Sequence, residues 1–173
     1  MAITKIQSES LNLADTYAFT GTVTGAGETN DCSWRATMGS NQSISNSTDT
    51  LVNFDTSVFD TDSGYNTTNK SYTIPTGKGG KFFIQAHIFH GPWGDNSGEY
   101  ADVYFKKNGT IFAQKRHVVE GDMSRAGSIN CFSIINLSAG DVITCKMWFN
   151  QGDARSIDAN TNLTHFTGFR ISS

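Results

Sequence analysis

Short runs of alternating apolar and polar residues, separated by clusters of Gly, Asn, Asp and Ser, recur from about residue 30 to the end of the chain. In DVITCKMWFN (141–150), every second side chain from Ile143 to Phe149 is apolar. A period of two is typical of a β-strand that lays one face on a core. Its repetition between turn clusters predicts an all-β sandwich or jelly roll.

One of these runs is apolar on both faces. KFFIQAHIF (81–89) carries Phe82, Ile84, Ala86 and Ile88 on one side and Phe83, Gln85, His87 and Phe89 on the other. A strand of this kind touches two neighbours. The second neighbour is either another layer of the same domain or another subunit.

Two hairpins are predicted from the turn residues. ADVYFKKNGTIFAQKR (101–116) has Asn108-Gly109 at its centre, and this pair accepts the positive φ angles of a two-residue loop. SINCFSIINLSAGDVITCKMW (128–148) has a turn at 138–141, which would place Cys131 and Cys145 opposite each other. The chain has three cysteines, an odd number without metal-ligand spacing, so reduced buried thiols are favoured and pairing stays open.

Charge and length exclude several classes of protein. The 173 residues suit one domain with a short appendage, and a net charge of -3 without a basic run argues against nucleic acid as a partner. The short stretch 115–117 (KRH) reads as a solvated strand edge. No apolar run predicts membrane insertion, and the first residues lack a signal-peptide pattern, so we expect folding in a cytoplasm.

The stretch FDTSVFDTDSGYNTTNKSYTIP (54–75) first suggests a calcium loop, with Asp60 and Asp62 as weak candidate ligands. An EF-hand loop needs a Glu six residues after its Gly, whereas Lys70 stands six after Gly64. We therefore expect no metal and no cofactor, although a cation here stays open. The favoured reading is a turn in which Asp and Asn bond their own backbone, Gly64 takes the awkward dihedral, and the core receives Phe54, Phe59, Tyr65 and Tyr72.

The same stretch resembles the signature of the C1q-like domain family, and further pieces match along residues 33–173. VYFKKNGT, LSAGD and HFTGFRIS resemble the family's hairpin, turn and closing strand. The departures are Tyr72 in place of Phe, a two-residue insertion in TGKGG, and Arg170 in the last strand. The matched residues are Phe54, Asp60, Tyr65, Tyr72, Gly80, Phe82, Asn108, Gly109, Gly140, Asp141, Phe166, Gly168 and Phe169.

This resemblance implies a ten-stranded jelly-roll sandwich of the C1q and tumour-necrosis-factor type, which assembles as a homotrimer through aromatic faces. The domain would span residues 30–173. Residues 1–29 would form an extended amino-terminal arm, although a disordered tail is the alternative for this segment.

The arm and the first part of the domain resemble virion proteins of marine tailed bacteriophages, especially those of cyanophage type. In that layout the arm attaches a knob to other virion proteins of the capsid or tail, and its contacts here would come from Leu11, Leu13, Tyr17 and Phe19. The resemblance implies a structural protein on the virion surface, assembled in the host bacterial cytoplasm. Capsid decoration or cement is favoured, because 29 extended residues reach only about 100 Å, too little for a fibre shaft.

The alternatives are a tail-fibre or spike tip that binds a host surface glycan or protein, and a free carbohydrate- or protein-binding module. For contact with a ligand the candidates lie in FHGPWGDNSGEY (89–100), namely Trp93, His90, Asp95 and Asn96. Trp93 could instead cap the end of the jelly roll. No catalytic motif is recognisable, so we expect no enzyme activity.

Overall fold

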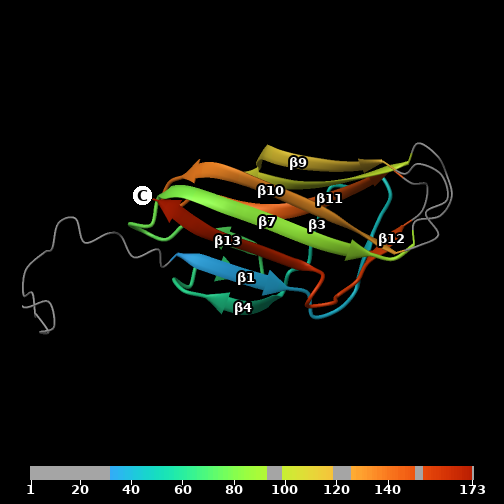
Figure 1. Ribbon diagram of the computed structural model, residues 1–173, viewed down its shortest axis with the longest axis horizontal. Coiled ribbons are helices and arrows are strands. Elements are labelled where there is room, and N and C mark those ends of the chain that lie inside the picture. The colour runs from blue at the N-terminus through green and yellow to red at the C-terminus, as the bar shows by residue number, and fades with distance from the viewer. Residues whose placement is uncertain (1–31, 93–98, 119–125, 151–153, 173) are drawn as a thin grey trace, which may run out of the picture.

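The computed structural model describes residues 32–92, 99–118, 126–150 and 154–172 (Figure 1). The regular secondary structure of these ranges consists of β-strands alone. The predicted arm, with Leu11, Leu13, Tyr17 and Phe19, lies outside them. The strands are β1 (Ser33–Thr37), β2 (Gln42–Ile44), β3 (Thr50–Leu51), β4 (Thr56–Asp60), β5 (Tyr65–Asn66), β6 (Ser71–Thr73), β7 (Gly80–His90), β8 (Tyr100–Lys107), β9 (Thr110–Val118), β10 (Gly127–Leu137), β11 (Val142–Asn150), β12 (Arg155–Ile157) and β13 (His165–Ser172).

The strands form two antiparallel sheets that pack face to face. The first sheet has the order β2-β12-β7-β13-β1-β4, with β10 paired to β7, and the second has the order β5-β6-β11-β8-β9, with β3 paired to β11. The expected all-β jelly-roll sandwich is confirmed. The described residues contain more than the ten expected strands because several, such as β3 and β5, are only two residues long.

The alternation read from the sequence sets which side chains enter the core. On β7, residues 82, 84, 86 and 88 are buried and the residues between them are half-buried, and β11 alternates in the same way from Ile143 to Phe149. The largest fully buried side chains are aromatic, namely Trp34, Tyr72, Phe54, Phe82, Phe105, Phe149 and Phe166. Burying such side chains supplies most of the driving force for folding, about 1.5–3 kcal/mol each.

The prediction of a hairpin between β10 and β11 is wrong. β10 pairs with β7 over its whole length in the first sheet, whereas β11 pairs with β8, β6 and β3 in the second. The turn at 138–141 therefore carries the chain from one sheet to the other. By contrast, the predicted β8–β9 hairpin is confirmed, with φ of 51° at Asn108 and 86° at Gly109.

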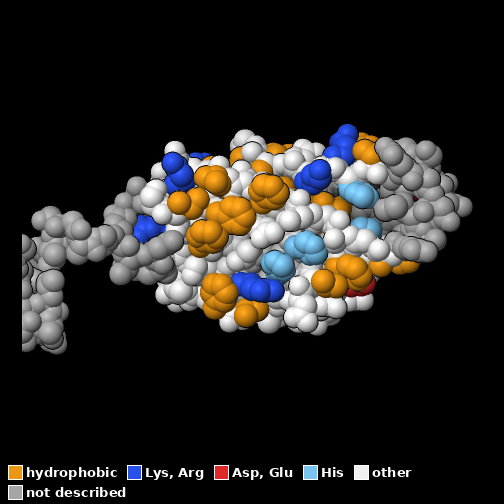
Figure 2. All heavy atoms as spheres, in the orientation of Figure 1, with side chains coloured by type: hydrophobic (Ala, Val, Ile, Leu, Met, Phe, Trp, Pro, Cys, Tyr) orange, Lys and Arg blue, Asp and Glu red, His pale blue; other side chains and the backbone are white. Residues whose placement is uncertain are grey.

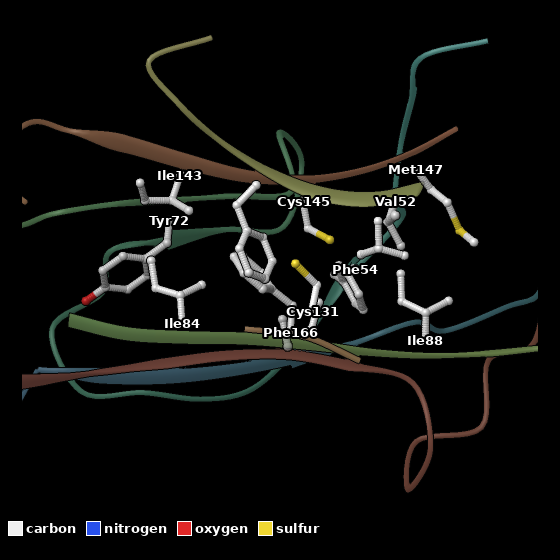
Figure 3. Close-up of a cluster of buried hydrophobic side chains, with 14 of the residues drawn as sticks. Val52, Phe54, Tyr72, Ile84, Ile88, Cys131, Ile143, Cys145, Met147 and Phe166 are labelled. Carbon is white, nitrogen blue, oxygen red and sulfur yellow. The ribbon is translucent and has the colours of Figure 1, made fainter. Parts of the chain in front are cut away.

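Cys131 and Cys145 face each other across the core rather than across a hairpin (Figure 3). Both thiols are free and buried, as is Cys32. Burial raises the pKa of Cys131 to about 11 and that of Cys145 well above its usual value. A thiol with so little thiolate character is a packing group rather than a nucleophile.

The described residues contain no helix long and apolar enough to cross a membrane.

Candidate interaction surface

The acidic loop that follows β4 is held by its own side chains, as predicted. Asp60 accepts a hydrogen bond from the backbone N–H of Tyr65 at 2.7 Å, and Asn66 accepts two, from Thr68 and Asn69, at 2.9 Å each. Asp62 forms an ion pair with Lys78 at 3.4 Å. Within the described ranges, no three or more His, Cys, Asp or Glu side chains are grouped as metal ligands, and a cation at Asp60 and Asp62 stays a prediction.

The role predicted for Gly64 is wrong. Ser63, with φ of 55°, takes the left-handed conformation, and Gly64 is not among the residues with positive φ. Gly64 is needed for space instead: a Cβ there would lie 2.6 Å from the carbonyl oxygen of Thr73 and 2.8 Å from the ring of Tyr72. The loop backbone therefore lies directly on the ring of a core tyrosine.

Three of the family-like signature residues, Phe54, Tyr65 and Phe166, meet in one aromatic cluster. Phe166 lies with its ring centroid 5.7 Å from those of Trp34 and Phe54, 5.8 Å from that of Phe105 and 6.3 Å from that of Tyr65. These three residues thus meet as packing groups of the core.

Tyr72, which stands where the family signature usually has Phe, places its hydroxyl against a polar partner in the core. The ring stacks on Trp34 at a centroid distance of 3.8 Å, and the hydroxyl oxygen lies 3.1 Å from Cys32 Sγ. A buried hydroxyl without a partner would cost free energy, so this contact lets a tyrosine stand in the core.

Phe59 and Phe169 do not pack in this core. Phe59 was predicted to be a core residue, and this is wrong, since it is 46% exposed on β4; Phe169 is 42% exposed on β13. In the register of the first sheet, Phe59 lies opposite Arg35, and Phe169 lies between Ser33 and Phe83. Arg35, Ser33 and Phe83 alternate with buried neighbours on their strands, so both phenylalanines lie on the side of the sheet that faces away from the core.

We call this side, formed by β10, β7, β13, β1 and β4, the outer face of the first sheet, and it faces the viewer in Figures 1 and 2. Hydrophobic side chains gather on it toward the C-terminal end of β13 (Figure 2). Phe132 is 63% exposed, Ile134 59% and Ile171 43%. Phe83 lies between Phe132 and Phe169, at centroid distances of 6.4 and 5.3 Å. We name these five residues the apolar patch: Phe83, Phe132, Ile134, Phe169 and Ile171.

Outside the apolar patch and the edge strand β4, the outer face is polar and carries no carboxylate on its long strands. Gln85 donates a hydrogen bond to Asn130 at 3.0 Å, and the rings of His87 and His165 stack at 5.8 Å. Arg35 lies in the next strand. Strands β1, β7, β10 and β13 contain no Asp or Glu at all. The face is therefore neutral to basic.

The second sheet presents a different outer surface. Asp49 accepts hydrogen bonds from Tyr104, from Lys106 at 2.7 Å and from Lys146 at 3.0 Å. Burial opposes its ionisation, but these bonds outweigh burial and lower the pKa of Asp49 to about 2. Arg116 on the edge strand β9 forms a two-bond pair with Asp102 at 2.7 and 2.8 Å. Charges on this surface are matched within the chain.

The candidate contact loop is only partly described. Trp93, Asp95 and Asn96 lie outside the described residues, so their role stays a prediction. His90 is fully buried on the inward side of β7, and burial lowers its pKa to about 4. This position argues against His90 as a ligand contact.

The outer face was only partly foreseen. The second apolar side of KFFIQAHIF predicted a contact on the outer face, whereas Phe132 and Ile134 were not predicted to be surface contacts. The signal for these two was present in SINCFSIINL, where apolar residues also stand on both faces.

No protein-family model matches the sequence, and no curated protein matches it. Among solved structures, the globular domain of zebrafish complement 1qA protein is similar, with a TM-score of 0.59, 12% identity, and coverage of 82% of this chain and 98% of that chain. Murine APRIL is similar with a TM-score of 0.56, 12% identity, and coverage of 81% of this chain and 98% of that chain. Eiger TNF from S. frugiperda is similar with a TM-score of 0.55, 10% identity, and coverage of 82% of this chain and 92% of that chain. At such identities the likeness shows the fold, which is the C1q/TNF-like jelly roll.

Proposed function

We propose that this chain is a structural and interaction protein whose jelly roll self-associates through the outer face of the first sheet. The observation that carries the proposal is the apolar patch, where Phe132, Ile134, Phe169 and Ile171 are each more than two-fifths exposed. Contiguous exposed apolar surface of this kind marks an interaction site. The matched ion pairs of the second sheet offer no comparable drive for association.

A second copy of the chain is the partner that fits best. The long strands of the outer face lack carboxylates, so the face does not call for a strongly basic partner, and its centre is apolar and aromatic as in interface cores. Closed symmetric assemblies are the usual form of self-association. The C1q-like signature implies a homotrimer, and we adopt that number.

The finer proposal is that the trimer is a knob on a bacteriophage particle, where it serves as a capsid decoration or cement protein. Its support is the resemblance of the arm and the first part of the domain to virion proteins of marine tailed phages. An arm of 29 residues, at most about 100 Å long, suits attachment between neighbouring capsid subunits. We assign the chain no catalytic role.

Cryo-electron microscopy of purified particles, with an antibody to the jelly roll as marker, tests the location. We expect density for the knob on the head, with residues 1–29 running between capsid subunits. Density at the tail tip would replace cement by the receptor-binding alternative. A protein absent from particles would leave a free binding module and overturn the virion proposal.

A further inference from the structure

A surface pocket of about 460 Å³ lies at the β4 edge of the outer face. It is formed by Arg35 and Thr37 of β1, by residues 56–58 of β4, and by Thr161 and Asn162 of the loop before β13. Its volume falls within the range of small-molecule sites, roughly 300–1,000 Å³. All of its lining residues belong to one protomer, and it lies at the edge of the outer face, away from the apolar patch through which we propose self-association.

Arg35 brings a positive charge to this pocket without a carboxylate to match it. One of its terminal nitrogens donates to the carbonyl oxygen of Thr161 at 3.3 Å, and no ion pair to Arg35 occurs in the described part of the chain. Its Nε–H is buried, and among the described residues it has no hydrogen-bond partner. A buried donor left in this state costs free energy unless a ligand binds it.

The two acidic residues at the ends of the β4 segment, Asp55 and Asp60, form no ion pair with Arg35. Asp55 accepts from the backbone of Gly39 at 2.7 Å and from Asn53 at 2.9 Å. One carboxylate oxygen of Asp60 accepts from the backbone of Tyr65 at 2.7 Å, and the other is buried without a hydrogen-bond partner among the described residues. The guanidinium of Arg35 therefore has no carboxylate acceptor in the described part of the chain, and a bound anion would supply one.

We propose that this pocket binds the small oxyanion group, carboxylate or sulfate, of an acidic sugar. A guanidinium fork matches the geometry of these groups. Thr37, Ser57 and Asn162, which also line the pocket, are residues with hydrogen-bonding side chains, and Val58 adds an apolar one. A sugar needs this mixture of one charge partner, several polar groups and one apolar surface.

His165 lies opposite Thr37 on β1, two residues from Thr167, the register partner of Arg35, and would report the bound anion. Burial lowers the pKa of His165, and the positive charges of Arg35 and of His87 lower it further. One ring nitrogen of His165, Nδ1, is buried and, within the described ranges, has no hydrogen-bond partner. An anion on Arg35 would cancel part of the positive field and so raise the pKa of His165.

Titration calorimetry and NMR on the full-length protein test the proposal with glucuronate, N-acetylneuraminate and inorganic sulfate, and with glucose as the neutral match of glucuronate. We expect at least one of the two sugar acids to bind and to raise the pKa of His165, and glucose to do neither. Binding of the sugar acids would support the proposal, whereas binding of inorganic sulfate alone would show an anion site without sugar recognition and overturn the assignment to an acidic sugar.

Arg35→Gln should weaken this binding about 10- to 100-fold, the effect of one charged hydrogen-bonding partner. Lys81→Gln, which removes another positive charge from the outer face, is the matched control and should leave it unchanged. The proposal is overturned if none of the anions binds the wild type, or if Arg35→Gln and Lys81→Gln weaken binding equally. It is also overturned if no anion binds and Arg35→Gln lowers the mass of the assembly, because Arg35 would then hold a group of a neighbouring copy.

Discussion

Asn108 and Asp141 tie together two turns that lie far apart in the sequence. Nδ2 of Asn108 donates to Oδ1 of Asp141 at 2.7 Å, and Oδ1 of Asn108 accepts from the backbone N–H of Val142 at 2.8 Å. Asp141 also accepts from the backbone of Ser138 at 2.8 Å and from Lys107 at 3.1 Å. The β8–β9 hairpin turn is thereby fixed to the turn that carries the chain between the sheets.

Asp141→Ala should therefore destabilise the fold by about 2 kcal/mol, since it leaves several donors without their charged acceptor. Urea unfolding followed by fluorescence measures the change. Asp62→Ala, which removes an ion pair with Lys78 at 3.4 Å and a long hydrogen bond from Thr61, is the control and should cost at most about 1 kcal/mol. Equal losses in the two variants would show that the two turns are not held by Asp141.

Gly168 allows the last strand to lie against Trp34. A Cβ at this position would come within 2.1 Å of the indole ring, in a core where the ring is stacked on Tyr72 and has no room to retreat. Gly168→Ala should therefore lower stability by about 3 kcal/mol or more, or prevent folding. Gly91→Ala, at a glycine whose added Cβ would have no atom of the described residues within 4 Å, is the control for thermal unfolding and expression. A Gly168→Ala protein with the wild-type melting temperature would contradict this packing.

The sequence predicted the fold well where a pattern of residues describes the packing of a single strand or turn. The alternation on β7 and β11 and the Asn108-Gly109 turn follow from the local backbone, and the structure has them as expected. The prediction of a β10–β11 hairpin was wrong because alternation shows that a strand has a buried face but does not show to which sheet the strand belongs. The prediction that Phe59 is a core residue was wrong for a related reason, since an aromatic residue on a strand can equally lie on the face that points away from the core.

The Arg35 pocket could not be read from the sequence. Arg35 and Thr161 are 126 positions apart, and only the folded chain brings the loop before β13 over β1. Likewise, nothing in LSAGD shows that its Asp reaches a turn 33 positions away. Contacts of such separation depend on the topology of the whole sandwich.

His90 predicts a pH dependence of stability. Its pKa is about 4 in the folded chain, against 6.5 for an unperturbed histidine, because burial disfavours the charged ring. The unfolded chain thus binds a proton between these values and the folded chain does not, so stability should fall as pH drops from 6.5 to 4. The loss reaches about 3 kcal/mol at the acid end.

Denaturant unfolding at a series of pH values, compared with His90→Gln, isolates this contribution. The variant should show a shallower loss of stability over the same range, whatever its stability at neutral pH. Parallel curves for the two proteins would mean that His90 does not titrate as described.

Sedimentation equilibrium of the full-length protein at micromolar concentration tests the central claim, self-association through the apolar patch, most directly. We expect three times the monomer mass of 18.8 kDa, about 56 kDa. The double variant Phe132→Ser/Phe169→Ser should sediment as a folded monomer, whereas Ile111→Ser, at a side chain 48% exposed on β9, should keep the wild-type mass. A wild-type protein near 18.8 kDa, or a double variant that still forms the trimer, would contradict the account.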